Sequence, residues 1–101
     1  MIQSYSHLDA AFGALSDPTR RGILERLGRG ECSISTLAGA FGMTLTGMKK
    51  HVKVLEGAGL VTTRKQGRVR HCRLGPQRLE AVQDWIATYQ ELLEGRLDLR
   101  P

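Results

Sequence analysis

The sequence predicts a mainly α-helical fold that carries one small β-hairpin. Apolar residues recur at spacings of three and four along most of the chain, which is typical of helices that bury one face. A β-branched stretch interrupts this pattern within residues 61–74, around a central glycine. With 101 residues, 41% of them hydrophobic and 25% charged, the composition is that of one globular unit. We therefore expect residues 1–101 to form a single domain.

Two helices are predicted at the N-terminal end. The first covers His7–Leu15, where Leu8, Phe12 and Leu15 fall on one face. A second helix should begin at Pro18, because Asp17 can cap its free amide groups and proline suits the first helical position. Its inward residues are Ile23, Leu24 and Leu27, and Gly28-Arg29-Gly30 should end it.

Two further helices follow with a very short connection. Ser33-Ile34-Ser35 offers an extended entry and then a cap for a short third helix, which Gly42 should end. Thr44 is the capping candidate for a fourth helix over residues 45–57, with Met48, Val52 and Leu55 facing inward. Such a short, glycine-containing link forces a steep crossing and is typical of a helix-turn-helix.

A hairpin and a long helix complete the chain. We expect two antiparallel strands, Val61–Lys65 and Arg68–Leu74, around a turn at Gln66-Gly67. With the preceding helices, this hairpin predicts a winged helix-turn-helix. The last helix should open near Pro76 and extend through Leu93, with Leu97 as an extension. Its apolar stripe either packs back on the core or, as we expect, pairs with a second copy.

Positive charge is concentrated in one third of the chain. Residues 43–78 hold nine lysines and arginines and the single acid Glu56, whereas residues 1–42 are balanced and residues 79–101 are acidic. A solvated surface normally mixes both signs, so this asymmetry favours a face that binds a polyanion such as nucleic acid.

Several function classes are disfavoured by composition and motifs. We expect a cytoplasmic protein without a membrane span, because no long apolar run or signal-peptide pattern is present. The sequence contains no glycine-rich phosphate loop, nucleophile elbow or local metal motif, so we expect neither an enzyme nor a cofactor. No residue pattern identifies an effector.

Two separated segments resemble the ArsR/SmtB family of bacterial repressors. The family's L-x-D-P-T-R opening of the second helix is similar to Leu15-Ser16-Asp17-Pro18-Thr19-Arg20. Its recognition-helix ending, H-L-x-x-L-x-x-A-G-L-V, is similar to His51-Val52-Lys53-Val54-Leu55-Glu56-Gly57-Ala58-Gly59-Leu60-Val61. The wing of the family resembles Gly67-Arg68-Val69-Arg70-His71, and the elements follow the same order over nearly the whole chain.

The resemblance implies a homodimeric winged helix-turn-helix regulator that binds an inverted-repeat operator on double-stranded DNA and usually represses transcription. It also implies that the first and last helices form the dimer interface. From their apolar positions, the predicted interface residues are Leu8, Phe12, Leu79, Val82, Trp85, Ile86, Tyr89 and Leu93.

DNA contacts are expected from the fourth helix and the wing. A helix fits the major groove, and arginines of a wing can reach the flanking minor groove or its phosphates. His51 either contacts phosphate or packs between helices, and Lys49 either alters base preference or adds a phosphate contact. For Arg20 we expect a structural salt bridge. The predicted DNA-binding set is Thr44, Thr46, Lys49, Lys50, His51, Lys53, Lys65, Arg68 and Arg70.

The chain departs from the family's metal sensors. Serines Ser33 and Ser35 occupy the two positions where such sensors have cysteines, and neutral hydroxyls bind soft metals poorly. The last helix offers carboxylates but no histidine, so we expect no metal site. Cys32 lies before the third helix, and we place Cys72 on the outer strand of the wing. This pair is either a buried filler, which we favour, or a redox sensor if the α-carbons come within about 7 Å.

Three functional hypotheses remain at this point. We favour a sequence-specific DNA-binding regulator. A winged-helix module that docks on another protein is the first alternative, since fold does not dictate function. A thiol-based redox-sensing regulator that uses Cys32 and Cys72 is the second.

Overall fold

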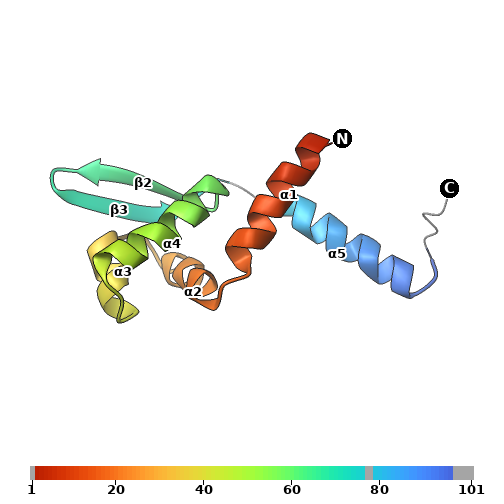
Figure 1. The fold of residues 1–101 in the computed structure, drawn as a ribbon, viewed down its shortest axis with the longest axis horizontal. Coiled ribbons are helices and arrows are strands. Elements are labelled where there is room, and N and C mark those ends of the chain that lie inside the picture. The colour runs from red at the N-terminus through yellow and green to blue at the C-terminus, as the bar shows by residue number, and fades with distance from the viewer. Residues whose placement is uncertain (1, 77–78, 97–101) are drawn as a thin grey trace.

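The computed structural model describes residues 2–76 and 79–96 and has an elongated shape (Figure 1). The order of elements agrees with the winged helix-turn-helix prediction, with one additional short strand. The elements are α1 (Ile2–Leu15), α2 (Pro18–Leu27), β1 (Cys32–Ser33), α3 (Ile34–Ala40), α4 (Leu45–Gly57), β2 (Val61–Gln66), β3 (Val69–Leu74) and α5 (Glu80–Leu93).

Side-chain caps set the starts of three helices. The Asp17 carboxylate accepts from the Arg20 amide, with Pro18 at the start of α2, as predicted. The Thr44 hydroxyl accepts from the Gly47 amide and starts α4 at Leu45, also as predicted. The cap of α3, expected within Ser33-Ile34-Ser35, is Ser33, whose hydroxyl accepts from the Thr36 amide at 3.0 Å. The helix can start there because the extended entry is only two residues long.

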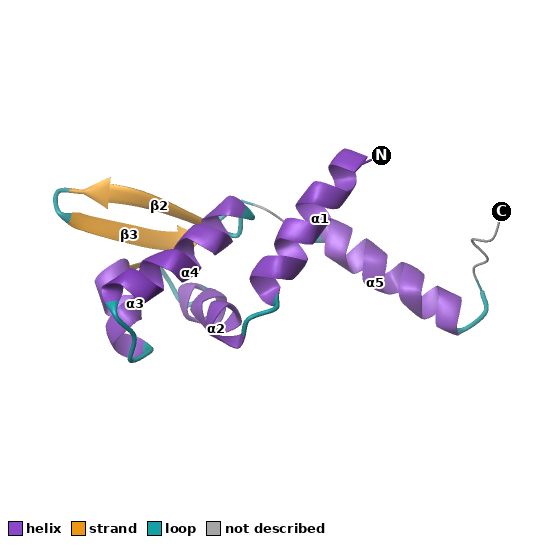
Figure 2. Cartoon of the chain, viewed as in Figure 1, coloured by secondary structure: helices purple, strands orange, loops and turns teal. Residues whose placement is uncertain are grey.

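The sheet has three strands, so the expected two-stranded hairpin was incomplete. Its order is β1-β3-β2, with both pairings antiparallel. Figure 2 shows the β2–β3 hairpin. Strand β1 is too short to produce a sequence periodicity, and only tertiary pairing reveals it. The added strand makes β3 central, so Cys72 does not lie on an outer strand. Instead Cys72 is buried opposite Cys32.

One apolar core joins the helices to the base of the sheet. The inward residues predicted for α4 are all buried, and so are Ile23 and Leu27 of α2. The largest side chains that are almost completely buried come from five elements: Ile23, Leu37, Met48, Leu55, Val61 and Cys72. This core holds α3 and α4 against the sheet, which fixes the wing beside the fourth helix.

Two glycines allow the wing to form. Gly67 has φ of +63° in the tight turn between β2 and β3, a conformation that side chains other than glycine seldom adopt. Gly75 lies where the chain leaves β3, and its amide donates to the Leu60 carbonyl at 2.8 Å. A Cβ atom on Gly75 would lie only 2.3 Å from the Gly59 carbonyl oxygen, so the two backbones can approach only at glycine.

The last helix is shorter than expected and lies apart from the wing. Helix α5 contains 14 residues and begins at Glu80, whereas we placed its opening near Pro76. It packs along α1, at the end of the molecule opposite the hairpin tip (Figure 1). The predicted extension at Leu97 lies outside the described residues. This arrangement separates the apolar surface of α5 from the basic surface of the wing.

Candidate nucleic-acid interface

Helix α4 presents one apolar and one basic face. Met48, Val52 and Leu55 anchor it in the core. The exposed side carries the predicted contact residues Thr46, Lys49, Lys50 and Lys53. Because these core residues fix the buried side of α4, the exposed lysines project from a rigid element. This is the geometry needed by a helix that reads DNA.

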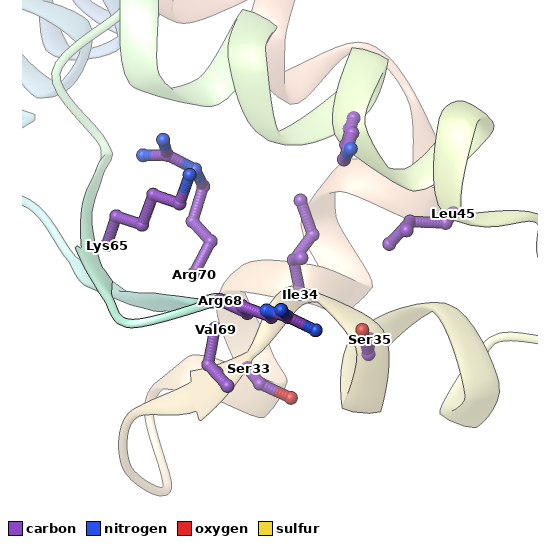
Figure 3. Close-up of a pocket in the computed structure, with 9 residues that line it drawn as sticks. Ser33, Ile34, Ser35, Leu45, Lys65, Arg68, Val69 and Arg70 are labelled. Atoms are coloured by element: carbon purple, nitrogen blue, oxygen red, sulfur yellow. The ribbon is translucent and has the colours of Figure 1, made fainter.

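The wing and α4 enclose a groove of about 340 Å³. On β2 and β3, Lys65 pairs directly with Arg70, and Arg68 follows the turn glycine. In Figure 3 the side chains of Lys65 and Arg70 lie together, and that of Arg68 lies beside Ser33 and Ile34 at the entry to α3. The groove is lined by Ser33, Ile34, Ser35, Leu45, Lys49, Lys65, Arg68, Val69 and Arg70. Four of these residues are basic and none is acidic, so the groove favours an anion.

Arg70 is already held in place by a short hydrogen-bonded chain. Its guanidinium donates to the Thr63 hydroxyl at 2.9 Å, and that hydroxyl donates to the Glu56 carboxylate at 2.8 Å. Lys49 and Lys53 line a second cavity together with Glu56 and Arg70. The single acid of the basic segment thus orients a wing arginine beside the lysines of α4.

The opposite face of the wing has different partners. Arg64 donates to the Glu31 carboxylate at 2.9 Å, and His71 Nδ1 lies 3.6 Å from the same carboxylate. The strand register puts Arg64 and His71 on one face, and Lys65 and Arg70 on the other. Arg64 therefore stabilises the wing through Glu31 on the face opposite the basic groove, and it does not line that groove.

His51 lies at the contact between α4 and the start of α2. Its Nδ1 is 3.3 Å from Arg20 NH1 and 3.9 Å from the Asp17 carboxylate. The backbone hydrogen bond from Arg20 is the main cause that lowers the pKa of Asp17, and the nearby Arg20 charge adds to it. The expected salt bridge of Arg20 is replaced, within the described residues, by bonds to backbone carbonyls and to His51.

The two cysteines meet at the base of the wing. Cys32 and Cys72 are directly opposite each other in the β1–β3 pair, a position at which α-carbons are typically about 4.5–5.5 Å apart. This satisfies the separation that a disulfide requires. Both thiols are free and buried, however, and burial raises the pKa of Cys32 and raises that of Cys72 to about 11. The reactive thiolate is therefore scarce near neutral pH.

The predicted dimer residues fall into two groups. Leu79 packs against the protomer's own core, Val82 is buried and Leu8 is half-buried. The remaining ones are exposed apolar side chains on α1 and α5, at 37% to 65% of their full exposure: Phe12, Trp85, Ile86, Tyr89 and Leu93. Trp85 stacks on Tyr89 with ring centroids 5.7 Å apart and meets the edge of Phe12. Phe12, Trp85 and Tyr89 thus form an aromatic cluster on a surface that also exposes Ile86 and Leu93; we call this the aromatic surface of α1 and α5.

Leu45, Leu92 and Glu56 contribute to these surfaces although they lie outside the predicted DNA-binding and dimer sets. Leu45 lines the basic groove and is 41% exposed at the start of α4. Leu92 adds to the exposed apolar side of α5. Glu56 holds Thr63 and, through it, Arg70. Exposed apolar positions in an amphipathic helix were detectable from the sequence, whereas the Glu56 contact depends on how the wing folds over α4.

Within residues 2–76 and 79–96, no group of three or more His, Cys, Asp or Glu side chains is arranged to hold a metal ion. In the same part of the chain, no helix has the length and hydrophobicity needed to cross a bilayer.

Comparisons with known proteins agree with this architecture. A family model described as a helix-turn-helix domain matches residues 15–64. The HTH-type transcriptional regulator Rv2034 of Mycobacterium tuberculosis is 37% identical, over 80% of this chain and 76% of its own length. The transcriptional repressor SdpR of Bacillus subtilis is 26% identical, over 81% of this chain and 91% of its own length.

Solved structures give the same result. The crystal structure of an ArsR family transcriptional regulator, RHA00566, matches with a TM-score of 0.81 and 46% identity, over 91% of this chain and 95% of that chain. The solution structure of the homodimeric winged helix-turn-helix DNA-binding domain Mb0332 from Mycobacterium bovis matches with a TM-score of 0.68 and 27% identity, over 96% and 87% of the two chains. The present chain therefore belongs to the ArsR family of winged helix-turn-helix transcriptional regulators.

Proposed function

We propose that this chain is a homodimeric transcriptional repressor that binds an inverted-repeat operator in the bacterial cytoplasm. In this proposal α4 enters the major groove and the basic wing contacts the flanking backbone. The observation that carries it is the acid-free groove between α4 and the wing, lined by Lys49, Lys65, Arg68 and Arg70. A site built from four cations of α4 and the wing has the charge that a DNA backbone requires.

Each part of the interface has a separate role in this proposal. Thr46, Lys49 and Leu45 lie at the start of α4, where recognition helices contact base edges. Lysine hydrogen-bonds the O6 and N7 acceptors of guanine, and apolar groups contact the thymine methyl. Arg68 and Arg70 extend from the wing, where arginine binds a narrow minor groove or its phosphates. The helix supplies sequence preference and the wing supplies affinity.

The aromatic surface of α1 and α5 supports the proposed dimer. Trp85, Ile86 and Tyr89 each remain about half exposed in the protomer, which is unfavourable for side chains of this size. The related Mb0332 domain is homodimeric. A two-fold dimer presents two copies of α4, so its half-sites should lie about 34 Å apart, one helical turn along the duplex. This symmetry is the reason for expecting an inverted repeat.

Repression and single-domain organisation are parts of the same proposal. The relative SdpR is a transcriptional repressor. A protein of this size that covers an operator can block transcription without a catalytic step, and the relatives named above are transcriptional regulators rather than enzymes. We propose that all 101 residues act as one DNA-binding unit.

The test is a binding titration against the DNA upstream of the protein's own coding region. We expect the protein to bind this duplex and retard it in a gel at low salt. The affinity should fall steeply as the salt concentration rises, because phosphate contacts release counterions. Random-sequence duplex of equal length is the control for specificity. A flat salt response, or equal affinity for both duplexes, would contradict the proposal. No binding to the upstream duplex even at low salt would favour the protein-docking alternative.

The register of β1 and β3 favours testing one alternative in the same titration. Cys32 and Cys72 are opposite each other, as a redox pair requires. Their burial and raised pKa values instead support the role of apolar fillers at the base of the wing. We expect hydrogen peroxide, zinc and a chelator each to leave the affinity unchanged. A loss of affinity with peroxide that dithiothreitol reverses would favour the redox-sensing alternative.

A further inference from the structure

Two arginines at the start of α2 close the end of α1. The last carbonyls of a helix lack intrahelical partners and need donors from elsewhere. Arg20 supplies two of these donors: its Nε donates to the Ala14 carbonyl at 2.9 Å and its NH2 to the Gly13 carbonyl at 3.0 Å. Arg21 NH1 donates to the Leu15 carbonyl at 2.7 Å. Both arginines therefore attach α2 to the end of α1.

Only Arg20 also reaches the recognition helix. Its third nitrogen, NH1, lies 3.3 Å from His51 Nδ1 on α4. A guanidinium can only donate hydrogen bonds, so a hydrogen bond at this contact requires Nδ1 to be the acceptor and places the ring proton of neutral His51 on Nε2. One planar side chain thus binds the end of α1 with two nitrogens and α4 with the third.

We infer that Arg20 is a positioning residue for DNA binding. It couples α1, which belongs to the proposed dimer interface, to the recognition helix α4, and it thereby sets the separation between the two α4 helices of the dimer. The inference rests on the proposed function. In that dimer α1 and α5 carry the apolar surface, with Phe12 near the end of α1, and Arg20 binds the same helix one residue further on. Within residues 2–76 and 79–96, Arg20 is hydrogen-bonded to α1 through Gly13 and Ala14 and lies within hydrogen-bond distance of His51 on α4.

The test measures tolerance to operator spacing. The probe is the inverted-repeat duplex that the wild-type protein selects from a random-sequence library. Further duplexes have one or two base pairs added or removed between the half-sites, and each base pair changes the separation by about 3.4 Å. For wild type we expect the affinity to fall by about fivefold or more on changing the spacing, the lower end of typical coupling between sites.

The matched variants are Arg20→Lys and Arg21→Lys, which both keep the positive charge. Lysine lacks the planar fork, so Arg20→Lys cannot hold the carbonyls and His51 together. The quantity compared is the affinity for the selected duplex divided by the affinity for a duplex with altered spacing. We expect this ratio to be no more than about two for Arg20→Lys and to equal the wild-type ratio for Arg21→Lys. A purely structural role would lower both affinities together and leave that ratio unchanged.

A second arm does not need the Arg20 variant to fold. His51→Asn keeps an acceptor near the Nδ1 position and should preserve the spacing ratio, whereas His51→Leu removes the acceptor and should flatten it. Nitrogen NMR of the wild-type histidine ring should show Nε2 protonated and Nδ1 bare before any DNA is added. Nδ1 protonation in the neutral ring, or equal spacing ratios in wild type and Arg20→Lys, would overturn the inference alone. Failure of wild type to select any repeat would overturn the proposed function as well.

Discussion

Removing one charge from each face of the wing tests which face meets DNA. Arg68 lines the groove beside α4, whereas Arg64 is held by Glu31 on the opposite face. Arg68→Gln and Arg64→Gln remove the same charge from the same hairpin, so long-range electrostatics change equally. We expect Arg68→Gln to weaken DNA binding and to lower its salt dependence, and Arg64→Gln to leave the salt dependence unchanged.

The size of the effect follows from counterion release. The logarithm of the binding constant falls with the logarithm of salt concentration by about 0.9 for each neutralised phosphate. A dimer loses two Arg68 contacts, so the slope should become shallower by about 1.8. Between 50 and 200 mM salt, a fourfold increase, wild type should then lose about twelvefold more affinity than the Arg68 variant. The Arg64–Glu31 pair is largely exposed, and such pairs contribute about 0–1 kcal/mol, so both variants should fold.

The assay is fluorescence anisotropy of a labelled duplex at five or more salt concentrations, with thermal unfolding of each variant as the control for folding. Equal slopes for wild type and Arg68→Gln would refute the reasoning, because the groove would then not hold phosphate. A shallower slope for Arg64→Gln than for Arg68→Gln would show that the opposite face of the wing binds DNA.

Three further predictions concern the dimer, the wing junction and the buried thiols. Trp85→Glu places a charge in the exposed aromatic surface and should yield monomers in sedimentation experiments; a stable dimer would contradict the proposed interface. Gly75→Ala puts a Cβ atom 2.3 Å from the Gly59 carbonyl oxygen and should lower the free energy of unfolding by about 1–3 kcal/mol in urea titrations, whereas an unchanged midpoint would contradict the close approach. Burial raises the pKa of Cys72 to about 11 from a usual value near 9, so the folded protein keeps a proton that the unfolded chain loses. The free energy of unfolding should therefore be unaffected by the ionisation of Cys72 below pH 9 and should fall by about 2 kcal/mol between pH 9 and 11. In urea titrations over this pH range, Cys72→Ala should show a smaller fall.

Local signals predicted most of the helices closely. Asp17 with Pro18 and Thr44 before an apolar repeat specify α2 and α4, because capping depends on neighbouring residues. The opening of α5 was placed too early, since Pro76 precedes the helix without starting it. Strand β1 was missed because two residues carry no periodicity, and its existence depends on pairing with β3, about forty residues away in the chain.

The candidate site also has one part that the sequence predicts and one part that depends on tertiary structure. The nine bases of residues 43–78 and their single acid could be counted from the sequence, and so the polyanion-binding face was predicted before any fold was known. The sequence could not show which of those bases share a groove. Arg64 and Lys65 are neighbours in the chain, yet the strand register places their side chains on opposite faces of the sheet. Arg64 is bound to Glu31 on one face, and Lys65 faces α4 on the other.

The amino-acid sequence by itself determined where α2 and α4 begin, which of their residues enter the core and where positive charge accumulates, because these depend on capping, periodicity and composition over a few turns of chain. Tertiary structure alone decided that Cys32 faces Cys72, that Glu56 holds Arg70 through Thr63, and that Arg20 joins α1 to His51. Each of these contacts unites residues from different elements, and their distance and angle exist only after the core has packed those elements together.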